Sequence, residues 1–345
     1  MPRRLTSLPS TIAVAAIALG ALLAFVPAPS AALQTGIGDN DPKMFASPYY
    51  LALHTTISRY VAPYDVADRP RDLAAVDAWI AAAEARHVQP LLAFYHSRSQ
   101  PGQLPSVTRY ALEIRRFIAL HPRITVYSAW NEANRSSSSG PGESSLRGPS
   151  PSAAAGYYLA LRRACPRCTI VGLDVLDSTN VASTISYIHA FQRDVHGQLP
   201  SIWGLHNYSD TNRFRNKGTR AVLAAVRGQL WLTETGGLVK FGSEFPNRYG
   251  SGLTRAKRAV AYAFKLAQSD RRITRLYLFA WFGGSSTARF DAGLMDSSGR
   301  PRPSYAVART YLTGASEAGT RESRRAEEAR RTRDVIGHRV LPRRP

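Results

Sequence analysis

The sequence predicts an α/β protein built as one (β/α)8 barrel, the TIM barrel fold, and three observations lead to this prediction. Hydrophobic residues make up 44% of the chain and charged residues 20%, which excludes wholesale disorder. Between residues 34 and 313, eight short β-rich apolar runs alternate with longer segments of helical periodicity. Such alternation predicts a parallel sheet covered by helices, and eight repeats in about 280 residues favour a closed barrel over an open doubly wound sheet.

Most of the eight predicted strands are bounded by Gly, Pro, Asn, Asp or Ser, which are typical turn residues. In chain order the strands are 35–39, 56–60, 88–95, 124–130, 169–175, 201–208, 229–234 and 273–281. The run from Gly36 to Asn40 at the first strand lacks the third glycine of a dinucleotide-binding fingerprint. A nucleotide-binding fold therefore has little support.

Between these strands, apolar residues recur at the spacing of one helix face. The clearest sets are Leu73, Val76 and Ile80; Tyr110, Ile114, Phe117 and Ile118; Val181, Ile185 and Ile188; and Val260, Ala263, Phe264 and Ala267. Each set predicts one helix with a single buried stripe that packs against the sheet.

The amino end is typical of a secretory signal. Arg3 and Arg4 precede an uncharged apolar run over 12–26, which is followed by prolines and small residues up to Ala32. We therefore expect residues 1–32 to be a signal peptide and the protein to be secreted. The apolar run is shorter than the roughly 20 residues of a membrane-spanning helix, so no membrane span is expected after cleavage; an uncleaved anchor is the lesser alternative.

The remaining chain divides into a barrel domain and a tail. We expect the barrel domain to cover 33–315, whereas 316–345 is rich in Arg and Glu with few large apolar residues and is expected to be a disordered tail. The stretch from Asn134 to Ser152 is rich in Ser, Gly and Pro, and it is long for a connection inside a barrel.

The chain is strongly basic, with 45 Lys and Arg against 24 Asp and Glu and a formal charge of +21. A positive surface favours encounters with acidic polymers, although a solvated basic face is the simpler interpretation. The arginines are scattered along the sequence rather than gathered with aromatic residues, so no nucleic-acid partner is expected. We expect a monomer.

The only two cysteines, Cys165 and Cys168, lie in the sequence Ala-Cys-Pro-Arg-Cys. This spacing permits a redox pair, and a zinc site would need two further ligands that the neighbourhood lacks. In an exported chain, a structural disulfide is the favoured interpretation.

Two glutamates end two of the predicted strands: Glu132 ends the fourth and Glu234 the seventh. The working face of a barrel lies at the carboxyl ends of its strands, so both side chains are expected at one mouth. Glycosidic bond cleavage requires such a pair, because one carboxyl protonates the departing oxygen while the other stabilises or traps the sugar cation. A separation of roughly 5–5.5 Å predicts retention of configuration, and a wider gap predicts inversion.

The sequence around both glutamates resembles the clan A glycoside hydrolases, retaining barrel enzymes that include cellulase-like, β-glucanase-like and β-xylosidase-like members. The residues that carry the resemblance are Trp-Asn-Glu-Ala-Asn at 130–134 and Trp-Leu-Thr-Glu-Thr-Gly at 231–236. The resemblance implies a carbohydrate substrate, with Glu132 as the general acid and base, Glu234 as the nucleophile, and Asn131 bound to the sugar 2-hydroxyl.

Four further residues resemble the same pattern. Arg59, at the end of the second predicted strand, resembles the arginine near the nucleophile. His206 and Tyr208 resemble the pair of the sixth strand, in which the tyrosine holds the nucleophile, and Trp281 resembles the sugar platform of the eighth. The resemblance spans predicted strands two to eight and identifies no single family within the clan.

The proposed chemistry needs one protonated and one ionised carboxyl. We expect burial against Trp130 and the charge of Glu234 to raise the pKa of Glu132. We expect Tyr208 and Arg59 to keep Glu234 ionised by hydrogen bonding and charge.

Structural roles are the alternatives. A strand-end glutamate can form an ion pair with one of the many arginines, and aromatic residues can plug a barrel mouth. A barrel that binds glycans or anionic cell-wall polymer without hydrolysis is the alternative function. The sequence contains no metal-binding or phosphate-binding motif, so no metal and no cofactor are expected.

Overall fold

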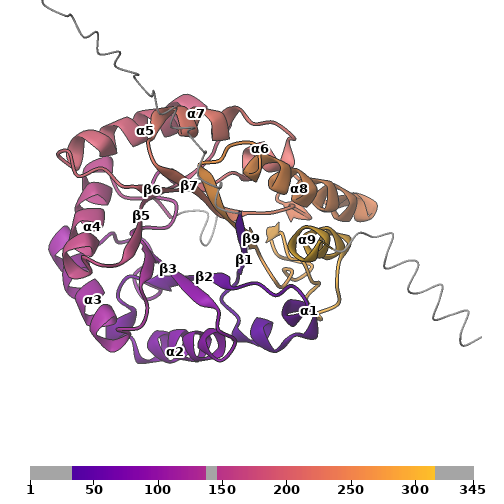
Figure 1. Cartoon of the computed structure of the whole chain (residues 1–345), viewed down its shortest axis with the longest axis horizontal. Coiled ribbons are helices and arrows are strands. Elements are labelled where there is room, and N and C mark those ends of the chain that lie inside the picture. Colours follow the sequence, from indigo (N-terminus) through magenta and orange to yellow (C-terminus); the bar gives the residue numbers. More distant parts are fainter. Residues whose placement is uncertain (1–32, 137–145, 315–345) are drawn as a thin grey trace, which may run out of the picture. The chain divides into compact units, whose positions relative to one another are not determined.

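The computed structural model describes residues 33–136 and 146–314, and it confirms the predicted (β/α)8 barrel. Eight parallel strands close into a barrel in chain order, with the last strand paired to the first (Figure 1). The predicted signal peptide, 1–32, and the predicted tail, 316–345, lie outside the described residues. The barrel strands are β1 (Gln34–Gly38), β2 (Ile57–Pro63), β3 (Gln89–Tyr95), β4 (Val126–Ser128), β5 (Thr169–Leu176), β6 (Ile202–His206), β7 (Gln229–Thr235) and β9 (Ile273–Phe279).

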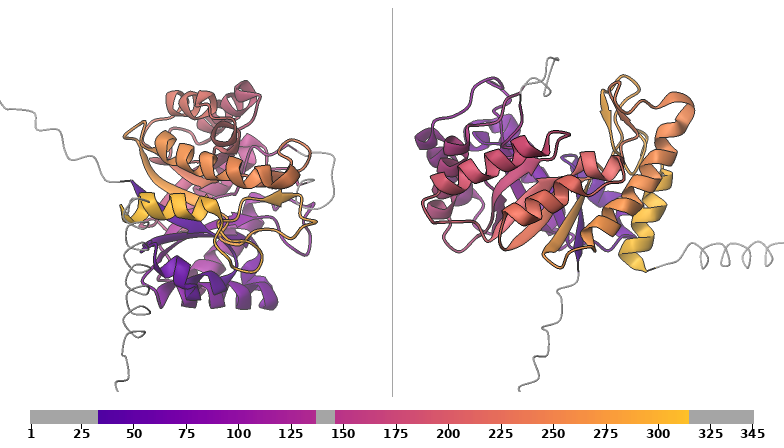
Figure 2. Two further views of the ribbon diagram at one scale, coloured as in Figure 1. Left: turned by 90° about the vertical axis from the view of Figure 1, so that its right-hand side faces the viewer. Right: turned by 90° about the horizontal axis from the view of Figure 1, so that it is seen from above.

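Helices surround the strands on the outside of the barrel (Figure 1). The longer ones are α2 (Pro70–Glu84), α3 (Val107–Leu120), α4 (Pro151–Ala164), α5 (Val181–Asp194), α7 (Lys217–Ala225), α8 (Ser251–Ala267) and α9 (Pro303–Thr313). The shorter ones are η1 (Pro42–Ala46), α1 (Pro48–Leu51), η2 (Val66–Asp68), α6 (Tyr208–Asn212) and η4 (Arg248–Gly250). In both views of Figure 2, α8 and α9 lie side by side, and Phe264 and Tyr311 stack between them at 4.3 Å.

Local sequence explains where several helices begin. The side chains of Ser106, Ser150 and Asn180 each accept a hydrogen bond from the backbone N–H three residues on, at the starts of α3, α4 and α5. These caps satisfy donors that a helix leaves unpaired. Proline occupies the start of α2, α4 and α9, where its missing N–H costs nothing.

The barrel interior changes from apolar to polar along the strands. Seven buried side chains from seven strands form an apolar layer: Ile57, Leu91, Val126, Val171, Ile202, Trp231 and Tyr277. One step nearer the carboxyl ends lie Arg59, Ser128, Asp174 and Thr233, which are also buried. Because the apolar layer closes the amino-terminal side, the polar side chains belong to the carboxyl-terminal mouth.

Two strand ends differ from the sequence prediction near the site. β2 continues to Pro63, so Arg59 lies inside the strand rather than at its end. β4 stops at Ser128, two residues earlier than predicted. Beyond Ser128 the chain still bonds to both neighbouring strands, through the N–H of Ala129 to the carbonyl of Val171 at 3.1 Å and the N–H of Asn131 to the carbonyl of Phe94 at 2.8 Å.

The end of β6 differs for a tertiary reason. The strand stops at His206, and Tyr208 begins the short helix α6 instead of ending the strand. The buried carboxylate of Asp177 accepts the N–H groups of Ser209 and Asp210, each at 2.8 Å. A carboxylate at the amino end of a helix stabilises its first turn. For α6 this carboxylate belongs to Asp177, which lies in the loop after β5.

Three further features complete the fold. Cys165 and Cys168 form the predicted disulfide, in the turn between α4 and β5. Two short strands, β8 (Lys240–Phe241) and β10 (Phe290–Asp291), pair as an antiparallel ribbon. Within the described ranges, the helices are all too short or too polar to cross a bilayer.

Candidate active site

Glu132 lies in the turn that follows β4, and its backbone adopts a left-handed conformation with φ of 49°. Non-glycine residues rarely occupy this region, and when they do it is often at functional sites. The turn is tied to β5: the side chain of Asn134 donates to the carbonyl of Leu176 at 2.8 Å and accepts from its N–H at 2.7 Å. These bonds hold the Glu132 side chain at the barrel mouth.

Glu234 is the penultimate residue of β7, and two predicted partners hold its carboxylate. Arg59 Nη1 donates to Oε2 at 2.7 Å, and Tyr208 Oη donates to Oε1 at 3.1 Å. One oxygen of Glu234 lies within 4.8 Å of one oxygen of Glu132. The two strand-end glutamates therefore converge, although 102 positions separate them in the sequence.

Arg59 connects the two strand ends through the interior. Its Nη2 donates to Asn131 Oδ1 at 2.5 Å and lies 3.5 Å from Asp174. The side chain is 1% exposed. Burial opposes the charged form, but the carboxylates of Glu234 and Asp174 outweigh that cost and raise the pKa of Arg59. Arg59 thus remains a cation within the site.

His206 bridges two carboxylates. Its Nδ1 lies 3.1 Å from Glu132 Oε1, and its Nε2 lies 3.4 Å from Asp174 Oδ1. Burial would lower the pKa of this imidazole, yet the charges of Asp174 and Glu234 and the hydrogen bonds raise it to about 10. His206 is therefore an imidazolium at neutral pH, which donates to Glu132 through Nδ1 and forms an ion pair with Asp174 through Nε2.

Asp174, in the middle of β5, is a site residue that the sequence reasoning missed. Thr233 Oγ1 donates to its Oδ1 at 2.5 Å, and Ser128 Oγ lies 3.3 Å from its Oδ2. Burial opposes its charge, but His206 and Arg59 lower its pKa overall. The signal in the sequence was a single carboxylate inside an otherwise apolar strand, because a buried charge needs partners.

Arg135, three residues after Glu132, is a second missed residue. Its Nη1 lies 2.5 Å from Glu132 Oε2, and its side chain is 24% exposed. Burial would raise the pKa of Glu132, but His206 and Arg135 outweigh it and lower the pKa below its ordinary value. The expectation of a raised pKa was wrong, because the sequence did not show that two cations flank this carboxylate.

Trp281 does not face the mouth in this structure. The ring is fully buried between Tyr50, at 5.5 Å, and Tyr305, at 6.1 Å, both edge-on. Its backbone N–H instead donates to Asp39 at 2.9 Å, which ties the ends of β9 and β1 together. The predicted sugar-facing surface of this indole is therefore covered by protein.

Among the described residues, three acids and three bases at the mouth are linked by ion pairs: Glu132, Asp174, Glu234, Arg59, Arg135 and His206. Their formal charges cancel when all six are ionised. Ligand atoms of Glu132, His206 and Glu234 lie within 4.8 Å of one another, a spacing that could hold a metal ion. Here, however, protonated His206 offers no lone pair, and guanidinium groups already bind both glutamates.

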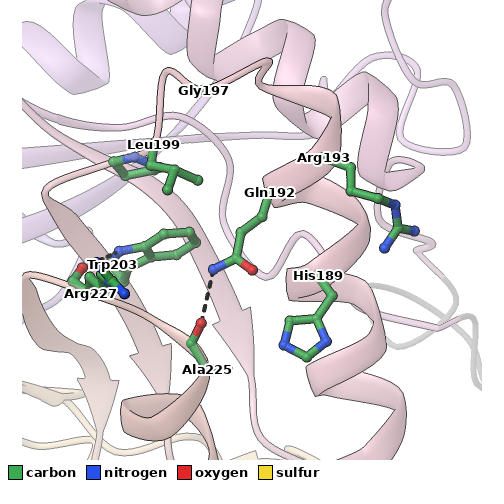
Figure 3. A pocket seen from close by; sticks show the side chains of 9 residues that line it. His189, Gln192, Arg193, Gly197, Leu199, Trp203, Ala225 and Arg227 are labelled. Carbon is green, nitrogen blue, oxygen red and sulfur yellow. Dashed lines mark hydrogen bonds between the residues drawn. The ribbon is translucent and has the colours of Figure 1, made fainter.

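A separate cavity of about 560 Å³ lies near the amino ends of β6 and β7, on the opposite face from the glutamates. Figure 3 shows that it opens between α5 and the segment after α7, where the Gln192 amide donates to the carbonyl of Ala225 at 2.9 Å. It is lined by His189, Gln192, Arg193, Gly197, Leu199, Pro200, Trp203, Ala225 and Arg227. None of the predicted site residues lies in it.

No known protein-family model matches the sequence, and no curated protein matches it. Solved structures share the fold. A GH5_18 protein from Streptomyces cattleya, solved with GlcNAc, is 14% identical with a TM-score of 0.57, over 82% of this chain and 80% of that one. A psychrophilic glycoside hydrolase family 10 endo-β-1,4-xylanase is 13% identical with a TM-score of 0.58, over 81% and 96%.

Xylanase 10B from Thermotoga maritima is similar as well, at 12% identity and a TM-score of 0.56, over 83% of this chain and 96% of that one. These likenesses extend over nearly the whole described chain. At the level of fold, they agree with the resemblance seen in the sequence. The chain therefore has the (β/α)8 barrel fold of glycoside hydrolases of families 5 and 10.

Proposed function

We propose that this protein is a secreted, retaining O-glycoside hydrolase that acts on a polysaccharide or oligosaccharide. The observation that carries the proposal is the convergence of Glu132 and Glu234, whose nearest side-chain oxygens lie within 4.8 Å at the barrel mouth. Retaining enzymes place their carboxyl groups roughly 5–5.5 Å apart, whereas inverting enzymes need a gap of about 6.5–9.5 Å for a water molecule. The separation favours double displacement.

Glu132 and Glu234 take part in both steps of double displacement. In the first, a Glu234 oxygen attacks the anomeric carbon, the bond to the glycosidic oxygen breaks, and Glu132 gives that oxygen its proton. In the second, Glu132 takes a proton from water, whose oxygen attacks the anomeric carbon and displaces Glu234. Arg59 and Tyr208 orient the nucleophile through their two hydrogen bonds.

Asn131 completes the arrangement. Arg59 donates to its amide oxygen, which fixes the orientation of the amide so that Nδ2 is the group available to a sugar hydroxyl. The names of the structural neighbours, which include xylanases, a galactanase and proteins solved with GlcNAc or Manβ1-4GlcNAc, support a carbohydrate substrate.

Removing either glutamate should abolish turnover. In a glycan and aryl-glycoside panel, we expect Glu234→Gln to lower kcat by at least about a thousandfold for every substrate that the wild type cleaves. We expect Glu132→Gln to lower it by roughly 10²–10⁴-fold for natural glycans, and by less for activated aryl glycosides, whose leaving groups need little protonation.

Glu113→Gln is the matched control, because Glu113 is a fully buried glutamate of α3 whose carboxylate pairs with Arg109 and Arg116 of the same helix. It should retain kcat. Normal cleavage by Glu234→Gln would refute the assignment of the nucleophile. NMR of the first-formed anomer should show retained configuration, and an inverted product would refute double displacement.

Glycan binding without hydrolysis is the second candidate. The lowered pKa of Glu132 favours it, because a carboxylate that is ionised at neutral pH is a poor proton donor. A protein of this kind would bind glycans on the panel, cleave none at any pH, and keep its affinity in the Glu234→Gln variant.

A further inference from the structure

A very short helix carries the tyrosine that binds the proposed nucleophile. Tyr208 is the first residue of α6, and its hydroxyl donates to Glu234 Oε1 at 3.1 Å. α6 has only five residues, and a helix of this length is not stable by itself. Contacts to the rest of the barrel therefore have to fix the backbone of Tyr208, and two buried side chains make such contacts.

Asp177, in the loop after β5, fixes the start of α6. Its Oδ1 accepts the N–H of Ser209 and its Oδ2 accepts the N–H of Asp210, each at 2.8 Å. Its own N–H donates to the carbonyl of His206 at 2.9 Å. Asp177 thus bonds to the backbone on both sides of Tyr208. Because the residue is buried, water competes little for these bonds.

Asn212, the last residue of α6, ties the helix to the segment that follows Glu234. Its Nδ2 donates to the carbonyl of Tyr208 at 3.0 Å and to that of Gly236 at 2.9 Å. Its Oδ1 accepts the N–H of Leu238 at 2.7 Å. Both donor hydrogens and the acceptor of this buried amide are therefore used. The amide directly joins the backbone of the tyrosine to the chain two residues after the glutamate.

The position of the Tyr208 hydroxyl follows from the position of α6. The Tyr208 ring is buried and packs edge-on against Phe290 of β10 at 5.6 Å, so the side chain has little freedom of its own. Arg59 binds the other oxygen of Glu234 at 2.7 Å. A displaced α6 would therefore leave the Glu234 carboxylate in the mouth but held at one oxygen instead of two.

We infer that Asp177 and Asn212 are positioning residues, which hold the Tyr208 hydroxyl on Glu234 and thereby orient the nucleophile. Both act through the backbone around Tyr208 rather than through a contact with the substrate. This inference rests on the proposed function and extends it to two residues outside the charged groups of the mouth. It predicts that replacing either residue impairs the chemical step only while the Tyr208 hydroxyl is present.

The kinetic test is a pair of double-mutant cycles with Tyr208→Phe. Asp177→Asn keeps the shape of the side chain but loses one acceptor, and Asn212→Asp turns an oxygen toward two carbonyls. Each should lower kcat on the best panel substrate by about tenfold and change KM by less than about threefold. In the Tyr208→Phe background, each should change kcat by less than about twofold. Assays at pH 8 lie above the pKa of Asp177, which burial raises to about 7.

Asp65→Asn is the matched control. Asp65 is buried like Asp177, but its carboxylate accepts from Ser97 Oγ at 2.7 Å and from Arg69 Nε at 3.0 Å, and not from α6. The variant removes the same charge and should keep the wild-type kcat. Losses of equal size with and without the Tyr208 hydroxyl, or no loss in either positioning variant, would overturn the inference.

A second measurement does not depend on turnover. The carboxyl ¹³C NMR signal of Glu234 in the whole protein reports its hydrogen bonds, and Tyr208→Phe gives the signal without the tyrosine contact. Asp177→Asn and Asn212→Asp should each move the signal toward that position, and Asp65→Asn should not. A signal that stays at the wild-type position in the folded variants overturns the inference, even if the wild type cleaves glycosides. A signal that moves in a protein that cleaves no glycoside refutes the proposed function and leaves the positioning of Glu234 standing.

Discussion

Asp174 is the residue on which the buried charges of the mouth converge. His206 and Arg59 lie 3.4 and 3.5 Å from its oxygens, and Thr233 donates to it at 2.5 Å. A fully buried carboxylate is tolerated only where cations and hydroxyl groups surround it. The Asp174 side chain acts on Glu132 through His206 and on Glu234 through Arg59, so it is a positioning residue.

Replacing Asp174 by Asn should impair catalysis more than substrate binding. Asp174 leads the groups that raise the pKa of His206, so the variant should have a lower His206 pKa and a loosened contact with Glu132. We expect kcat to fall by roughly 10–100-fold and KM to change by less than about threefold. Steady-state kinetics and an NMR titration of His206 measure both effects.

Asp65→Asn is the control for this variant, since Asp65 is a buried aspartate with an arginine partner, Arg69, outside the cluster. It should keep both kcat and the His206 pKa. If Asp174→Asn leaves the pKa of His206 unchanged, Asp174 does not hold the imidazole in its charged form.

Single residues differ in how far the sequence reveals them. Glu132 and Glu234 are recognisable because they follow apolar strands whose carboxyl ends must meet in a barrel. Trp281 was assigned to the mouth on the same grounds, but its side chain points into the core. Arg135 is one arginine among 40, and nothing local distinguishes it.

At the scale of elements, the turn after β4 depends on a close backbone approach. A Cβ on Gly148 would lie 2.1 Å from the carbonyl oxygen of Ala133 and 3.1 Å from that of Glu132. The Gly148 N–H also donates to the carbonyl of Arg135 at 2.8 Å. Only glycine allows the chain before α4 to lie against the turn that carries the acid.

Gly148→Ala should therefore displace the turn. Because backbone atoms must move, we expect the free energy of unfolding to fall by about 1–3 kcal/mol. A displacement of the order of 1 Å at Glu132 should also lower kcat/KM by roughly a hundredfold. Urea denaturation and kinetics on the best panel substrate test these expectations.

Gly102→Ala is the control, because no atom of the described part of the chain lies within 4 Å of a Cβ placed on Gly102. It should match the wild type in both measurements. Equal stability and activity of Gly148→Ala would show that the segment before α4 can shift without moving Glu132.

The elements themselves were predictable because strands and helices follow hydrophobic periodicity. All eight predicted strands are present in the barrel. Their ends were less predictable: β6 ends at His206 because Asp177, from another loop, starts α6. A partner that is distant in the sequence leaves no local signal.

For the whole molecule, the buried charges link stability to pH. The pKa of His206 is about 10 in the folded protein and 6.5 for an ordinary histidine. The folded state therefore binds a proton that the unfolded chain has released between these values. This contribution to stability is complete below about pH 6.5 and is lost as pH rises toward 10.

We expect the free energy of unfolding of the wild type to fall with a slope of up to about 1.4 kcal/mol per pH unit from this group between pH 7 and 9. His206→Gln should lack that slope, and Asp174→Asn should show a smaller one, which keeps the test available if one variant folds poorly. Urea titrations at pH 6, 7, 8 and 9 measure it. Parallel curves for the wild type and both variants would contradict the link.

The sequence by itself determined the barrel, the disulfide and the two glutamates at strand ends. Hydrophobic periodicity, the spacing of the cysteines and the order of the strands can all be read from the chain without knowing its three-dimensional structure. Only the tertiary structure decided the charge states of the mouth. A pKa depends on which groups lie within a few ångströms, and strands far apart in the chain supply the neighbours of Glu132. For the same reason, Asp174 and Arg135 emerged as site residues only when the barrel closed around them.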